Sequence, residues 1–88
     1  MQKITLQEAE TIGNTLGILW NDISLEEFVM GMNVELEHGT KFPETNVTGN
    51  DPLLTGKIAW AHLKKFPDYY TRLAKLESEA DAFWKNKR

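Results

Sequence analysis

The chain is 88 residues long, with 41% hydrophobic and 26% charged residues, a composition typical of a globular domain that excludes wholesale disorder. Halves of so short a chain would each be too small to bury a core, so we expect a single domain spanning residues 1–88. The absence of cysteine excludes disulfides, thiolate nucleophiles and cysteine-bound zinc. The longest run without a polar side chain, residues 28–32, is far shorter than a membrane span. We therefore expect a cytoplasmic protein without membrane contact.

The net charge of −3 is divided unequally along the chain. Residues 1–56 carry two basic and nine acidic side chains, whereas residues 57–88 carry eight basic and four acidic ones. We expect the acidic first part and the basic second part to form complementary faces of one domain. The cations of the second half are Lys57, Lys64, Lys65, Arg72, Lys75, Lys85, Lys87 and Arg88. Carboxylates are interleaved with them, so we interpret them as solvated helix faces and do not expect nucleic acid binding.

The first helix is predicted from its two ends. Thr5 and Glu8 form a capping box, in which each side chain accepts a hydrogen bond from the backbone amide of the other residue. A helix should therefore begin directly after Thr5. Gly17 suits the position after the helix, where a left-handed backbone is needed, and Ile18 would cover that end. Apolar and small residues recur at helical spacing in between: Leu6, Ala9, Ile12, Gly13 and Leu16.

A second helix is predicted to begin after Ser24, because Ser24 and Glu27 repeat the capping-box spacing. Ile23 and Phe28 would pack against each other across this helix start as a hydrophobic staple. The apolar stripe of the helix comprises Leu25, Val29, Met32 and Leu36. Gly39 is a natural stop signal, so we expect the helix to end there.

Residues 40–51 are predicted to form a loop, because they are rich in Thr, Asn, Gly, Pro and Lys and offer only Phe42 and Val47 as apolar anchors. A loop of this length is long for a small domain, and long loops are commonly functional or mobile. It is therefore a candidate site in its own right.

The third helix should begin at Pro52, with Asp51 as its N-cap, and should be interrupted at Pro67, which cannot donate a helical hydrogen bond. Its sequence is apolar around much of the helix circumference, which favours a central position in the fold. The alternative is that its edge, formed by Leu53 and Trp60, contacts a partner.

A fourth helix should follow Asp68, whose carboxylate favours a helix start. Its apolar stripe comprises Tyr69, Leu73, Leu76, Ala80 and Phe83. The sequence thus predicts an all-α protein, a small bundle of about four helices with one long loop at residues 40–51.

No catalytic constellation accompanies these helices. The only serines, Ser24 and Ser78, fall at a helix cap and on the polar side of the last helix, and the sequence has no glycine-rich phosphate loop or nucleophile elbow. We therefore expect that the protein is not an enzyme.

The two histidines are candidates for binding. His62 falls on the apolar face of the third helix, where it fits a core residue, and His38 at the end of the second helix suits the helix dipole. Glu35 and His38 have the Glu-x-x-His spacing that metal-binding bundles use. Gly31, one turn earlier, would let another helix approach closely. If that neighbour is the third helix, His62 would complete a site for zinc, manganese or iron.

Several short motifs occur together: residues 35–40 (Glu-Leu-Glu-His-Gly-Thr), 46–48 (Asn-Val-Thr), 51, 55–59 (Thr-Gly-Lys-Ile-Ala), 62–63 (His-Leu), 67–70 (Pro-Asp-Tyr-Tyr) and 73. Across about residues 28–80, this pattern resembles a family of small proteins of unknown function from bacteria, phages and other viruses. The resemblance implies a phage or mobile-element accessory protein, or a small bacterial protein of unassigned role, in the cytoplasm of a bacterial cell or infected host. It also implies an acidic residue three positions after His62, where this chain has Lys65, and this departure counts against a metal site.

Most residues of these motifs are polar or aromatic. A fold that depended only on its hydrophobic core would not need this set of residues. We therefore expect a non-enzymatic helical interaction protein that binds a host macromolecule, most simply a protein, without a cofactor. The candidate binding residues are Glu35, His38, Thr40, Asp51, His62, Asp68, Tyr69 and Tyr70. Tyrosines suit recognition because each joins a large apolar ring to a polar tip. Two other interpretations stay open: a buried polar network, and a metal-binding bundle that uses Glu35, His38 and His62.

Overall fold

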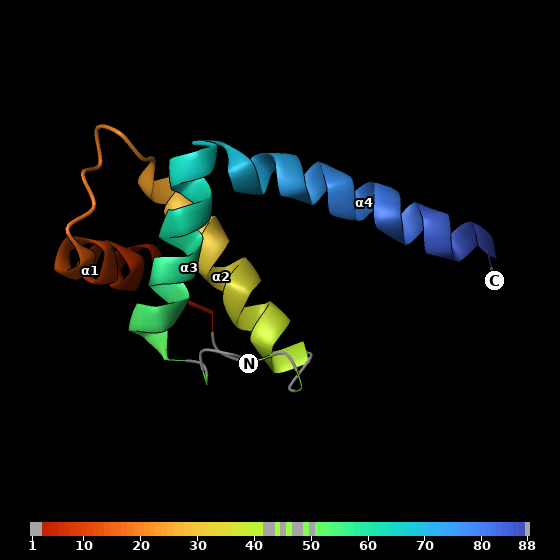
Figure 1. Ribbon diagram of the computed structural model, residues 1–88, viewed down its shortest axis with the longest axis horizontal. Helices are drawn as coiled ribbons and strands as arrows, with labels where there is room; N and C mark the ends of the chain where they lie inside the picture. The colour runs from red at the N-terminus through yellow and green to blue at the C-terminus, as the bar shows by residue number, and fades with distance from the viewer. Residues whose placement is uncertain (1–2, 42–43, 45, 47–48, 50, 88) are drawn as a thin grey trace.

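The described part of the chain consists of four helices and contains no strand (Figure 1). The computed structural model describes residues 3–41, 44, 46, 49 and 51–87, and the side chains of residues 38–40 and 87 are not among the described groups. The helices are α1 (Leu6–Leu16), α2 (Leu25–Lys41), α3 (Pro52–Lys65) and α4 (Tyr69–Lys87). The predicted fold class, a small all-α bundle of four helices, is confirmed.

The helices are arranged around a central pair. α2 and α3 lie side by side and run in opposite directions, and α1 packs against both (Figure 1). The beginning of α4 also contacts both, but the helix then leaves the bundle and extends the molecule to 44 × 26 × 20 Å. α3 contacts each of the other three helices, as α2 does, which fits its predicted central position. Leu53, on the edge that the alternative assigns to a partner, is nevertheless 43% exposed, so the burial of α3 is incomplete there.

α1 begins and ends where its caps predict. The Thr5 amide donates to Glu8 Oε1 at 2.9 Å and the Glu8 amide donates to Thr5 Oγ1 at 3.1 Å, which completes the capping box. The hydrogen bonds with Thr5 hold the pKa of the Glu8 carboxyl below its usual range. Gly17 adopts the left-handed backbone of a helix C-cap (φ 89°), and Ile18 is buried beside it.

The start of α2 forms only half of the predicted capping box. The Glu27 amide donates to Ser24 Oγ at 3.3 Å, but the Glu27 carboxylate bonds to α4 instead of returning to the Ser24 amide. The other end also differs, because α2 continues through Gly39 to Lys41 and the predicted stop at Gly39 is wrong by two residues. Glycine permits a helix end without imposing one, since it costs a helix only about 1 kcal/mol relative to alanine.

Local signals also determine both ends of α3. Asp51 Oδ1 accepts hydrogen bonds from two first-turn amides, those of Leu53 and Leu54, at 2.8 and 3.1 Å. The helix ends just before Phe66, whose extended backbone is the conformation that a following proline favours. The predicted N-cap and the predicted break at Pro67 are both confirmed.

The core lies between α1, α2 and α3 and extends under the first turn of α4. Its buried apolar residues are Ala9, Ile18, Ile23, Phe28, Met32, Ala59, Leu63 and Tyr70. Both members of the predicted staple, Ile23 and Phe28, belong to it. Trp20 packs against Phe28 with ring centroids 5.6 Å apart and lies over Gly13, where a side chain would collide with the indole.

The apolar stripe of α4 divides into a packed part and an exposed part. Tyr69 and Leu73 are half-buried against the bundle, whereas Leu76 is 60% exposed and Phe83 is 52% exposed. Trp84, next to this stripe, is 60% exposed. The outer part of the stripe therefore adds little to the core of this chain.

Candidate functional site

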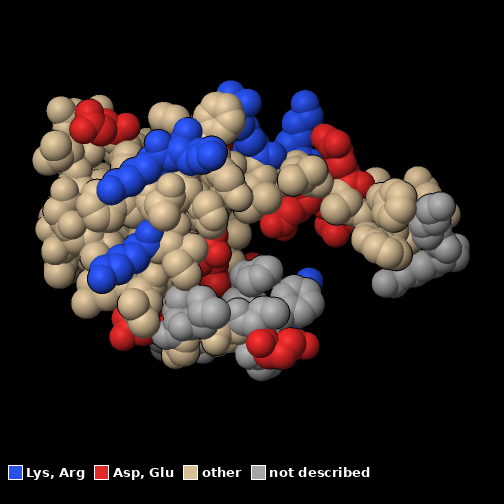
Figure 2. All heavy atoms as spheres, viewed as in Figure 1, with Lys and Arg blue, Asp and Glu red and all other residues tan. Residues whose placement is uncertain are grey.

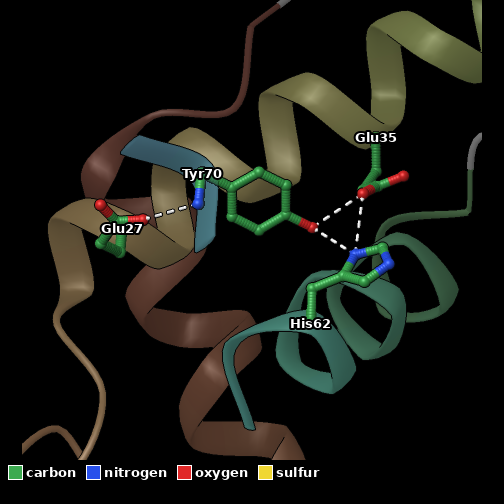
Figure 3. A network of polar contacts seen from close by, with 4 residues as sticks. All are labelled: Glu27, Glu35, His62 and Tyr70. Atoms are coloured by element: carbon green, nitrogen blue, oxygen red, sulfur yellow. Dashed lines mark hydrogen bonds and ion pairs between the residues drawn. The ribbon is translucent and has the colours of Figure 1, made fainter. Parts of the chain in front are cut away.

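Tyr70, the second residue of α4, joins three helices at one polar site (Figure 3). Its side chain is only 1% exposed, and its ring lies against Gly31 of α2. A Cβ atom at position 31 would collide with the ring carbons of Tyr70. The prediction that Gly31 admits a close neighbour is confirmed, although the neighbour is α4 rather than α3.

The Tyr70 hydroxyl meets a carboxylate and an imidazole (Figure 3). It donates to Glu35 Oε2 at 2.7 Å and lies 2.8 Å from His62 Nδ1, which is 3.2 Å from the same carboxylate oxygen. A carboxylate can only accept, so the hydroxyl proton belongs to the bond with Glu35, and Nδ1 must carry its own proton to bond within this triangle. Neutral His62 is therefore held as the Nδ1–H tautomer, with the lone pair of Nε2 pointing away from the network.

Ring contacts hold His62 in this orientation. Its imidazole is stacked on Tyr69, with centroids 4.5 Å apart and an interplanar angle of 4°. The ring of Tyr69 in turn meets that of Tyr70 nearly edge-on, at 5.0 Å and 75°. The His62 side chain remains 38% exposed, so the network reaches the molecular surface at this residue.

Glu27 secures the other end of Tyr70. Its carboxylate accepts a hydrogen bond from the Tyr70 amide at 3.2 Å and one from the Thr71 hydroxyl. These donors lie in the first turn of α4, where amides have no partner within the helix and the helix dipole favours an anion. Because it accepts these two bonds, Glu27 acts as an N-terminal cap of α4 that is supplied by α2, and its side chain is buried.

The chemistry of this site is that of a hydrogen-bonded anchor. Burial raises the pKa of Tyr70 above its usual range, and the hydrogen bond to Glu35 and the charges around the ring raise it further. Tyr70 consequently keeps its proton at neutral pH, and its hydroxyl remains a donor to Glu35. A tyrosine in this state positions its neighbours instead of acting as an acid or a nucleophile.

The structure brings together four of the predicted binding residues, namely Glu35, His62, Tyr69 and Tyr70. Tyr70 participates from the core. Asp51 caps the far end of α3, and Asp68 accepts a hydrogen bond from Arg72 Nε at 2.9 Å on the exposed side of α4. The side chains of His38 and Thr40, and most of the predicted 40–51 loop, lie outside the described residues.

The predicted metal set is brought together only in part. Glu35 and His62 are adjacent, but the atoms that face each other are bonded to one another and to Tyr70. Among the side chains that the structure describes, no three His, Asp or Glu residues come together as candidate metal ligands. His38, the third member of the set, is not among those side chains.

Sequence reasoning missed two functional features. Glu27 was explained by its own helix start, and the contact with Thr71, 44 residues away, leaves no local signal. The exposure of Leu76 and Trp84 was also missed. The spacing of an apolar stripe does not say which part of the stripe is covered, although a tryptophan next to the stripe is a usable hint.

The fold and the site thus define a class: small all-α proteins in which a buried tyrosine, bonded to glutamate and histidine, attaches a projecting C-terminal helix to a three-helix unit. None of the helices in the described residues is long and apolar enough to cross a membrane. The chain belongs to the DUF5661 family of proteins of unknown function, whose model matches residues 9–79. The predicted membership of a family of unknown function is confirmed. Comparisons with curated proteins and with solved structures give no match.

Proposed function

We propose that this protein is a non-enzymatic protein-binding module in which α4 is the recognition helix. One observation carries the proposal: α4 leaves the bundle (Figure 1), and large apolar side chains on its outer part are exposed. Leu76 and Trp84 are each 60% exposed there. Contiguous exposed apolar surface of this kind is typical of protein interaction sites.

The polar network supports the same function by fixing the direction of α4. Tyr70 is bonded at its amide by Glu27 and at its hydroxyl by Glu35. A recognition helix held in one direction loses less conformational freedom when a partner binds than a helix that swings freely. In this proposal the network is a positioning device, and the partner contacts the outer part of the helix.

A non-enzymatic role is consistent with how the candidate groups are used. Glu27 accepts a hydrogen bond from the Tyr70 amide, and Glu35 accepts one from the Tyr70 hydroxyl. His62, whose side chain is 38% exposed, is the most exposed member of this network. The likeness to small proteins of bacteria and phages supports a role as a phage or mobile-element accessory protein that binds a host protein.

The proposal can be tested by site-specific crosslinking in the bacterial host. A photoreactive benzoylphenylalanine placed at Leu76 should crosslink to a discrete partner, whereas the same residue at Ser78, on the opposite face of α4, should not. Trp84→Ala should reduce the crosslink at position 76. Equal crosslinking at both positions, or none at either, would contradict a recognition role for this face.

A further inference from the structure

The outer part of α4 has the pattern of one half of a coiled coil. Tyr69, Leu73, Leu76, Ala80 and Phe83 are spaced by four, three, four and three residues, which is the heptad spacing of a two-helix seam. The bundle covers the first two positions in part, while Leu76 and Phe83 remain exposed. A seam with this spacing fits a second helix, because knobs placed every 3.5 residues match the grooves of a helix.

The inner end of this seam offers an anchoring position. An open hollow lies where α4 leaves the bundle, and its lining includes Phe66, Tyr69, Leu73 and Leu76. Three of these residues belong to the seam itself. A large apolar side chain near one end of a partner helix would enter this hollow while the rest of that helix lies along α4.

The flanks of the exposed seam are acidic. Glu77 is next to Leu76 on one side of the stripe and Glu79 is next to Ala80 on the other, which are the positions that pair across a coiled coil. Between Lys75 and Lys85 the charged residues are all carboxylates. Figure 2 shows red side chains along the projecting helix, whereas blue side chains gather over α3 and the beginning of α4.

These charges disfavour a second copy of the chain as the occupant. In an antiparallel pair aligned over the exposed seam, Glu77 and Glu79 would face the same residues of the other copy. In a parallel pair Arg72 would be the cation offered to Glu77, but Arg72 is bonded to Asp68 and its guanidinium lies 4.1 Å from the Phe66 ring centroid. A partner with cations at its flanking positions meets none of these obstacles.

We propose that α4 binds an amphipathic helix of another protein, with an apolar stripe that packs on Leu76, Ala80 and Phe83 and with lysine or arginine beside it to meet Glu77 and Glu79. This inference rests on the proposed function and adds the chemistry of the partner. It predicts an interaction that is weakened by salt, because the flanking charges are exposed and screened.

The experiment uses two designed helical peptides as probes. Both are about three heptads long with leucine at the seam positions, but one carries lysine at the flanking positions and the other glutamate. Fluorescence anisotropy against the full-length protein should show that the lysine probe binds at least tenfold more tightly. In Glu77→Lys/Glu79→Lys the preference should reverse, whereas Ser78→Ala, on the opposite face of α4, should leave it unchanged.

Each of the other outcomes would contradict a cationic helix as the partner, and two of them would identify a different occupant of the seam. Equal binding of the two probes, or no binding while the Leu76 crosslink persists, would contradict the cationic helix but leave the proposed function standing. A dimer in sedimentation that Leu76→Glu dissociates would assign the seam to a second copy of the chain. Binding to vesicles of phosphatidylglycerol that Trp84→Ala abolishes would assign it to a lipid surface.

Discussion

The two parts of α4 belong to one continuous helix but have opposite surroundings. Around Tyr70 the helix is held by a close glycine contact, by a cap from Glu27 and by a hydroxyl bonded to Glu35. Around Leu76 and beyond, the same helix has large exposed apolar residues and acidic flanks. In the proposed function, stability and binding therefore depend on different turns of one helix, and substitutions should separate the two properties.

The largest expected effect concerns the glycine contact. Gly31→Ala places a Cβ atom where the Tyr70 ring lies, so we expect a loss of about 3 kcal/mol in the free energy of unfolding, measured by urea denaturation. Gly56→Ala is the matched comparison, because its Cβ would lie at 3.0–3.4 Å from core side chains and should cost less. An equal cost at the two positions would contradict the special closeness of α4 at Gly31.

The second-largest loss of stability is expected from removing Glu27, the residue of α2 that caps α4. Glu27→Ala leaves the Tyr70 amide and the Thr71 hydroxyl without their acceptor, and we expect it to lower the free energy of unfolding by about 2 kcal/mol. Glu37→Ala, which removes an exposed carboxylate from the same helix, should change it by less than about 0.5 kcal/mol. Similar losses for the two variants would show that Glu27 acts only on its own helix.

The hydroxyl of Tyr70 should contribute less. Tyr70→Phe removes the hydrogen bond to Glu35 but keeps the ring, so we expect a loss of about 1.5 kcal/mol at neutral pH. In the same variant, the ring nitrogens of His62 should keep their single-tautomer pattern in nitrogen NMR spectra, because Glu35 Oε2, 3.2 Å from Nδ1, still accepts the Nδ1 proton. A mixture of tautomers would show that the Tyr70 hydroxyl orders Nδ1 instead.

The same hydroxyl makes stability sensitive to alkaline pH. The pKa of Tyr70 is higher in the folded state, so its contribution is fully present below the pKa of an unfolded tyrosine, about 10, and declines as the pH rises above it. The loss attributable to this group should approach about 1.4 kcal/mol per pH unit. Denaturation from pH 8 to about pH 11 should show this component in the wild type and not in Tyr70→Phe; parallel curves would contradict it.

The smallest effect on stability is expected on the exposed turns. Leu76→Ala and Trp84→Ala should each change the free energy of unfolding by less than about 0.5 kcal/mol, because both side chains are mostly exposed. Both should nevertheless weaken binding to the lysine probe. A large loss of stability in either variant would show that the outer helix is part of the core after all.

Local chemistry explains which features could be predicted from the sequence. The starts of α1 and α3 were predictable because Thr5 and Asp51 bond to amides two or three residues away. Glu35 and His62 were recognised as candidates by residue type and helix face. The burial of their common partner, Tyr70, could not be predicted, because nothing local to it indicates Gly31, whose missing side chain creates the buried position.

The first turn of α4 is held at three points, which are the Tyr70 amide, the Tyr70 hydroxyl and the Thr71 hydroxyl, and three such points fix the direction of the helix. With a rise of about 1.5 Å per residue, Lys85 lies about 22 Å along the helix from that attachment. A tilt of about 10° at the root would move the tip by roughly 4 Å, the size of a side chain. A small change in the direction of α4 at Tyr70 therefore produces a large displacement of the far end of the helix.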